Sequence, residues 1–212
     1  MLCVAGSAAA APGESLVSRW LLFVLALVLA APALASPPDG VAARLRQPEV
    51  LRGGFEQDKQ LQGFRNPLRS SGDFLLVRGR GLAWDTRAPF PSGTVIGARG
   101  IIVSTPDGGE RVLARADDPA QDLLMALVGA DLEALARSFE TQETLLEDGR
   151  WRLRLLPRDA GLHSVFASVE LAGDEHVREV RIEEAGGDTT VLRFLELRTS
   201  PPPTDAELAR LD

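Results

Sequence analysis

The chain has 212 residues and a formal net charge of −7, from 30 acidic and 23 basic side chains. This acidic balance argues against binding to a nucleic-acid backbone, which requires clustered positive charge. The single cysteine, Cys3, excludes an internal disulfide framework. The length suits one domain with a sizeable hydrophobic core.

The first 35 residues are typical of a cleavable export signal. Arg19 precedes an apolar run of twelve residues, Trp20 to Ala31, and Ala33-Leu34-Ala35 then supplies the small-x-small pattern of a signal-peptidase site. As a helix this run would rise only about 18 Å, short of the roughly 30 Å hydrocarbon core of a bilayer. We therefore expect a signal peptide at 1–35, cleaved near Ala35; a retained short anchor is the alternative. Cleavage would remove Cys3 and with it any cysteine-linked lipid.

After a proline-containing leader and a short helical pattern at 41–50, the sequence takes on the pattern of an antiparallel sheet. Turn signals rich in Gly, Asp and Asn recur between short β-rich runs. Trp151, Leu153 and Leu155 alternate with arginines, which is typical of a strand with one wet face. Further runs at 177–183 and 189–197 indicate a meander. We expect one domain over residues 36–200.

One helical region interrupts the strands. Between residues 119 and 140, apolar side chains recur at helical spacing, and Gly129 is expected to divide the region into two shorter helices. Together with eight or more strands, this predicts a mainly β (α+β) fold, in which a curved antiparallel sheet forms an incomplete barrel with a helical lid. The lid is the 119–140 region, and the interior beneath it should be apolar. The proline-rich tail, 201–212, is expected to be mobile.

The two histidines of the sequence do not indicate a catalytic or metal site. His163 lies near Asp159 and Ser164, but no Gly-x-Ser-x-Gly elbow surrounds it, so we interpret it as a solvated histidine at a strand edge. His176 lacks a second histidine or cysteine at ligand spacing, so a turn with solvated side chains is expected there too. We predict no enzyme activity, no catalytic residue, no metal and no cofactor.

The strand at 73–80 places one arginine in an apolar setting. Alternation puts Phe74, Leu76, Arg78 and Arg80 on one face. If that face lines the interior, Arg78 lies at the inner rim, where its five donors could bind carbonyls at helix ends of the lid and act as a latch. The alternative is an exposed strand arginine surrounded by water. The residues alone leave both interpretations open.

Short motifs in the same region resemble those of a known family. The chain contains Phe55-x-Gln57, then Gly72-Asp73, then Arg78, and six residues after it Trp84. This order resembles that of the periplasmic outer-membrane lipoprotein carriers (LolA-like), and the likeness extends over residues 41–198. It implies that Arg78 corresponds to the arginine that latches the family's lid. The family usually has proline after that arginine, whereas Gly79 follows here, so Arg80 could share the role.

The resemblance implies a carrier function in the periplasm. The expected carrier is a monomer that binds acyl chains of lipoproteins, or of another lipid or polyene, and shuttles them from an inner-membrane donor transporter to an outer-membrane acceptor. The alternative is a cell-envelope sensor or scaffold domain that binds a protein partner through its concave apolar face. Ten apolar residues are candidates for the lipid-binding cavity: Phe55, Phe74, Leu76, Leu82, Trp84, Leu124, Leu127, Val128, Trp151 and Leu153.

Overall fold

The structure is a computed structural model that describes residues 40–212 apart from 106 and 116–118. The side chains of 119–122 and of 124 also lie outside the described part. The expected signal peptide at 1–35 falls outside it as well. Within the described residues, no helix combines the length and the apolar character needed to cross a membrane.

The described residues form an open antiparallel sheet of 11 strands in the order β6-β5-β4-β3-β2-β1-β11-β10-β9-β8-β7. The first half of the sheet is a meander of β1 (Val50–Gln60), β2 (Leu68–Val77), β3 (Gly81–Ala88), β4 (Ser92–Gly97), β5 (Gly100–Ser104) and β6 (Glu110–Ala114). The second is a meander of β7 (Phe139–Leu145), β8 (Trp151–Pro157), β9 (Phe166–Gly173), β10 (Val177–Glu184) and β11 (Thr189–Arg198). Antiparallel pairing of β1 with β11 joins the two halves, with Phe55 opposite Phe194. The predicted fold class is confirmed.

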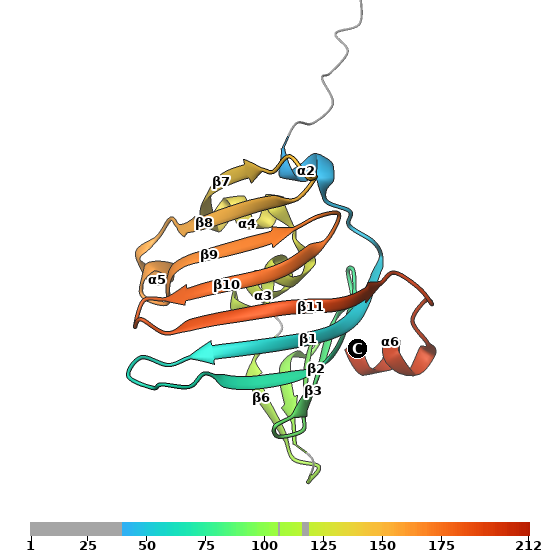
Figure 1. Cartoon of the computed structure of the whole chain (residues 1–212). Coiled ribbons are helices and arrows are strands. Elements are labelled where there is room, and N and C mark those ends of the chain that lie inside the picture. Colours follow the sequence, from blue (N-terminus) through green and yellow to red (C-terminus); the bar gives the residue numbers. More distant parts are fainter. Residues whose placement is uncertain (1–39, 106, 116–118) are drawn as a thin grey trace, which may run out of the picture. The chain divides into compact units, whose positions relative to one another are not determined.

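Alternation along the strands decides which face of the sheet is buried. In β8, Trp151, Leu153 and Leu155 are buried while the intervening arginines 152 and 154 are exposed, as the sequence pattern predicts. The buried face carries the main hydrophobic cluster, which continues across β9, β10, β11, β1, β2 and β3. Figure 1 shows α3 (Pro119–Gly129) and α4 (Leu132–Ser138) behind the sheet. Leu127 and Leu135 belong to the same cluster, so the lid covers this face.

The lid breaks where the sequence predicts. α3 ends at Gly129, and the next residue, Ala130, has a left-handed backbone with φ of 49°. Asp131 then caps α4, since its carboxylate accepts a hydrogen bond from the Ala134 backbone N–H at 2.9 Å. α3 and α4 are therefore two short helices joined by a tight corner, which we call the lid junction (residues 129–131).

The C-terminal residues differ from expectation. Instead of a mobile tail, residues Asp205–Leu211 form helix α6, which Thr204 and Glu207 start with a capping box. The Leu211 side chain is 1% exposed and packs with Leu75 and Val77, on the opposite face of the sheet from Phe74. The sequence prediction overlooked that β2 is apolar on both faces, so that its second face also needed a cover. Two very short helices complete the fold, α2 (Val41–Arg44) before β1 and α5 (Ala160–His163) before β9.

Candidate functional site

Most of the ten expected cavity residues come together as tightly packed core. Seven of them belong to the buried main cluster: Phe55, Phe74, Leu76, Leu82, Leu127, Trp151 and Leu153. Trp84 and Val128 are partly buried against it, and the side chain of Leu124 lies outside the described part. The structure therefore places these residues on the interior side of the sheet, but it fills much of that interior with their own side chains.

Aromatic rings form the centre of this interior face. Phe55 stacks on Trp84 with ring centroids 3.9 Å apart, and Phe74 meets Phe194 edge-on at 5.1 Å. Gly72 makes room for them, because a Cβ at this position would lie 2.9 Å from the Phe55 ring and 1.9 Å from the Asp85 carbonyl oxygen. A side chain at position 72 would therefore displace the Phe55 ring or the backbone of β3. Phe194 was not among the candidates, since it lies in a strand with no motif around it.

Open space lies beside this core, under the lid junction. A pocket of about 420 Å³ is bounded by the end of β2 and by both lid helices. Its apolar wall includes Leu76, Met125 and Ala126, so one of the expected cavity residues borders it. Its charged wall consists of Arg78, Asp131 and Arg137. Sequence reasoning missed Met125 and Arg137, because nothing in the helical pattern distinguishes a residue at a pocket from one on the outer face.

Two side chains from the sheet side hold the lid junction. Arg78 Nη2 donates to the Gly129 carbonyl oxygen at 3.4 Å, and its Nε donates to the Pro48 carbonyl oxygen at 3.4 Å. Gln47 Nε2 donates to the Ala130 carbonyl oxygen at 3.1 Å. The last carbonyls of α3 have no partner within a regular helix, so external donors of this kind satisfy them. We call Gln47 and Arg78 the junction tether.

The tether has the form that the latch hypothesis requires, with bonds of modest strength. Distances of 3.4 Å lie beyond the usual range for N–H···O bonds, and the Arg78 side chain is exposed, so water competes for its donors. Gln47 was missed, because a glutamine next to Pro48 carries no sequence signal for a role of this kind. The latch role of Arg78 stays a prediction.

Arg80 does not contact the lid junction but lies beside the C-terminal helix. β2 ends at Val77, and Gly79 turns the chain with φ of 72°, so the strand alternation expected through Arg80 is wrong. The Arg80 guanidinium pairs with the Asp212 carboxylate at 2.8 Å, beside α6. The geometry thus associates Arg78 with the lid and Arg80 with the C-terminal helix.

The two histidines have surroundings that differ from expectation. His163 is the last residue of α5 instead of a strand-edge residue, and Asp159 and Ser164 bond to the α5 backbone and form no triad with it. His176 is only 8% exposed, so the predicted solvated side chain is wrong. Burial lowers the pKa of His176 below its ordinary value, because the charged imidazolium is poorly solvated there. In the described part of the chain, its Nε2 has no hydrogen-bond partner.

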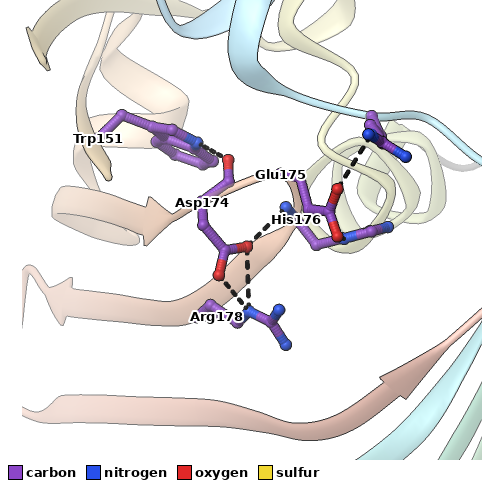
Figure 2. A network of polar contacts seen from close by, with 6 residues as sticks. Trp151, Asp174, Glu175, His176 and Arg178 are labelled. Atoms are coloured by element: carbon purple, nitrogen blue, oxygen red, sulfur yellow. Dashed lines mark hydrogen bonds and ion pairs between the residues drawn. The ribbon is translucent and has the colours of Figure 1, made fainter. Parts of the chain in front are cut away.

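Figure 2 shows the polar network around the β9–β10 turn to which His176 belongs. The Trp151 indole N–H donates to the Asp174 carbonyl oxygen, and the Asp174 carboxylate accepts from the His176 backbone N–H and from Arg178. The neighbouring Glu175 pairs with Arg46 at 3.0 Å. These contacts fasten the turn to β8 and to the segment before β1, which is a structural role. Among the described residues, no group of three or more potential ligands could hold a metal ion.

The described residues thus form an open antiparallel sheet with a helical lid over its apolar face. A family model described as outer membrane lipoprotein carrier protein LolA matches residues 46–208. The chain therefore belongs to the LolA family. The expected resemblance is confirmed, and the match extends through most of α6.

Comparison with solved structures shows similar but distant folds. A LolA superfamily protein from Nitrosomonas europaea aligns with a TM-score of 0.42 and 11% identity, over 76% of this chain and 90% of that one. A lipoprotein-sorting protein domain from Vibrio parahaemolyticus gives 0.41 and 11%, over 79% and 92%. MucB, in its Pseudomonas aeruginosa complex with MucA, gives 0.42 and 16%, over 75% of this chain and 54% of that one. No curated protein matches the sequence.

Proposed function

We propose that this protein is a periplasmic carrier that holds an acyl chain of a lipoprotein or related lipid between its sheet and its lid. The observation that carries the proposal is the pocket of about 420 Å³ beneath the lid junction. It adjoins the apolar core through Leu76, and the junction above it is held by the weak bonds of Gln47 and Arg78. Family membership supports the same function.

The physical need for such a carrier follows from the cost of exposing an acyl chain to water. Each methylene costs about 0.8 kcal/mol, so a dozen methylenes cost on the order of 10 kcal/mol. An apolar pocket removes most of this cost during passage between two membranes. Release is equally necessary, and a lid that prefers its closed position opposes overly tight binding. In this mechanism, the junction tether sets how strongly the lid prefers to close.

The proposed carrier works in the periplasm between two membrane partners. The export signal expected at 1–35 and the family match both support a periplasmic location. An inner-membrane donor and an outer-membrane acceptor would load and unload a monomeric carrier. The mechanism uses binding and lid movement alone, so it involves no catalytic residue, metal or cofactor.

Binding of a fluorescent fatty-acid probe to the purified exported protein tests the proposal, alongside mass spectrometry of lipids that co-purify with it. Met125→Glu places a charge in the pocket wall and should weaken probe binding at least tenfold. Leu113→Glu is the matched control, because Leu113 is an exposed residue on β6. Wild-type protein that neither binds the probe nor carries lipid would refute carriage. A stable complex with a protein partner and an empty pocket would support the scaffold alternative instead.

A further inference from the structure

The charged wall of the pocket restricts the kind of lipid that fits it. Leu76, Met125 and Ala126 form the apolar side, while Arg78 and Arg137 also line the pocket. A neutral hydrocarbon would offer these two cations no further counter-charge. A lipid with an anionic end would place its hydrocarbon chain against the apolar residues and its charged group near the two arginines.

Both arginines have donors to spare. Arg78 makes two bonds, each 3.4 Å long, to neutral carbonyl oxygens of Pro48 and Gly129. Arg137 pairs with Glu133 at 3.8 Å, and both side chains of that pair are largely exposed, so the pair is weak. A guanidinium has five N–H donors in a planar fork that matches a carboxylate or phosphate in a two-bond arrangement. An anionic group could therefore bind either arginine more favourably than its present partners do.

The acidic group in the pocket wall, Asp131, is paired with neither arginine. Asp131 uses its carboxylate to accept the Ala134 backbone N–H at the start of α4, and that contact fixes its direction. The residues that line the pocket carry two guanidinium groups and one carboxylate, and the Glu133 carboxylate that pairs weakly with Arg137 lies outside this lining.

The volume of the pocket matches one short acyl chain. At roughly 30 Å³ per water molecule, about 420 Å³ corresponds to some 14 waters, and a methylene group is of similar size. The pocket is open to solvent on one side, and its volume is enough for one chain of about a dozen methylenes. The volume lies in the lower part of the range of about 300–1,000 Å³ for small-molecule sites.

From charge and volume together, we propose that the pocket selects a single acyl chain with an anionic end group, a carboxylate or phosphate, which Arg78 and Arg137 bind. This inference rests on the proposed carrier function and narrows its ligand class. Arg78 then has two roles, because the same guanidinium holds Gly129 in the empty protein and meets the end group in the loaded one.

Isothermal titration of the full mature protein with matched twelve-carbon compounds tests the inference. The ligands are dodecyl phosphate, dodecanoate, dodecanol and dodecyltrimethylammonium, each below its micelle concentration, with inorganic phosphate as the chain-free arm. The anionic compounds should bind at least tenfold more tightly than dodecanol, and the cationic one should bind most weakly. Inorganic phosphate alone should bind too weakly to measure.

Substitutions of the two arginines test whether their positive charge causes the preference for anionic lipids. Arg78→Leu should reduce the preference for dodecyl phosphate over dodecanol about tenfold, Arg137→Leu should reduce it less, and Arg78→Lys should keep an intermediate preference because it retains charge without the fork. Arg111→Leu, on β6, is the control and should change nothing.

Equal affinity of wild-type protein for dodecyl phosphate and dodecanol would overturn this inference while leaving acyl carriage intact. An anion preference that persists in the Arg78→Leu/Arg137→Leu double variant would do the same. Inorganic phosphate binding as tightly as dodecyl phosphate would mean an anion site independent of the chain, and would also overturn it. Failure of every twelve-carbon compound to bind would instead refute the carrier function itself.

Discussion

Loosening the junction tether should raise the population of open lid by a predictable amount. The perturbation is the double variant Gln47→Ala/Arg78→Leu. The Gln47 bond to Ala130, at 3.1 Å, is a neutral hydrogen bond worth about 1 kcal/mol. The Arg78 bond to Gly129 is longer, at 3.4 Å, and exposed, so we assign it about 0.5–1 kcal/mol. Together they favour the closed lid by about 1.5–2 kcal/mol, a factor of roughly 10–30 in population.

Native-state amide hydrogen exchange measures this change directly. The Asp131 N–H bonds to the Ala126 carbonyl oxygen at 3.0 Å, and the Leu135 N–H bonds to the Asp131 carbonyl oxygen at 2.9 Å, so both amides report on the lid junction. They should exchange roughly 10–30-fold faster in the double variant, whereas amides of the buried strand β9 should keep their rates. Because the two bonds hold adjacent carbonyls, the single variants need not add up to the double one.

Arg80→Leu is the matched control for this experiment. It removes an exposed ion pair with Asp212, worth about 0–1 kcal/mol, at the other face of the sheet. Exchange at the junction should stay at the wild-type rate in this variant. Unchanged exchange in the Gln47/Arg78 variant would refute the tether, and faster exchange in the Arg80 variant would move the latch to Arg80.

Three further predictions test other parts of the molecule. N-terminal sequencing of the exported protein should start at or near Ser36, and a sequence starting at Met1 would contradict signal cleavage. Leu211→Ala should lower the free energy of unfolding in urea by about 2–5 kcal/mol, because it empties a buried site under α6, while the exposed Leu195→Ala should have little effect; equal losses would contradict the docking of α6. Because burial lowers the pKa of His176 below its ordinary 6.5, the unfolded chain binds the proton more tightly, so stability should fall as the pH drops below about 6.5. His176→Gln should remove that part of the pH dependence and His163→Gln should not; a pH profile unchanged by His176→Gln would contradict it.

The sequence predicts the architecture well where alternation and turn chemistry are strong. The arginine–apolar alternation of β8 and the break of the lid at Gly129 both come from local periodicity, and both are found in the structure. The residues alone leave open whether Arg78 contacts a helix-end carbonyl or water, and only the tertiary structure places it near Gly129. Periodicity does not show which apolar residues leave space between them, so most expected cavity residues are packed core.

The misses have a common physical cause, which is contact between segments distant in sequence. Gln47 bonds to Ala130 across 83 positions. Leu211 packs in one cluster with Leu75, which lies in β2, nine strands earlier in the chain. His176 is buried because the β9–β10 turn is fastened to Trp151 and to Arg46, neither of which is near it in the local pattern. Such contacts follow from tertiary structure and leave little local signal.

Photocrosslinking with an acyl chain that carries a terminal benzophenone is the most direct test of the central claim, that the chain lies between β2 and the lid. Mass spectrometry of the adducts should place them on the apolar pocket wall, at Leu76, Met125 and Ala126. Met125→Glu should abolish those adducts, whereas Leu113→Glu should leave them in place. Adducts concentrated instead on exposed apolar residues such as Phe64 or Phe90, and insensitive to Met125→Glu, would contradict the account.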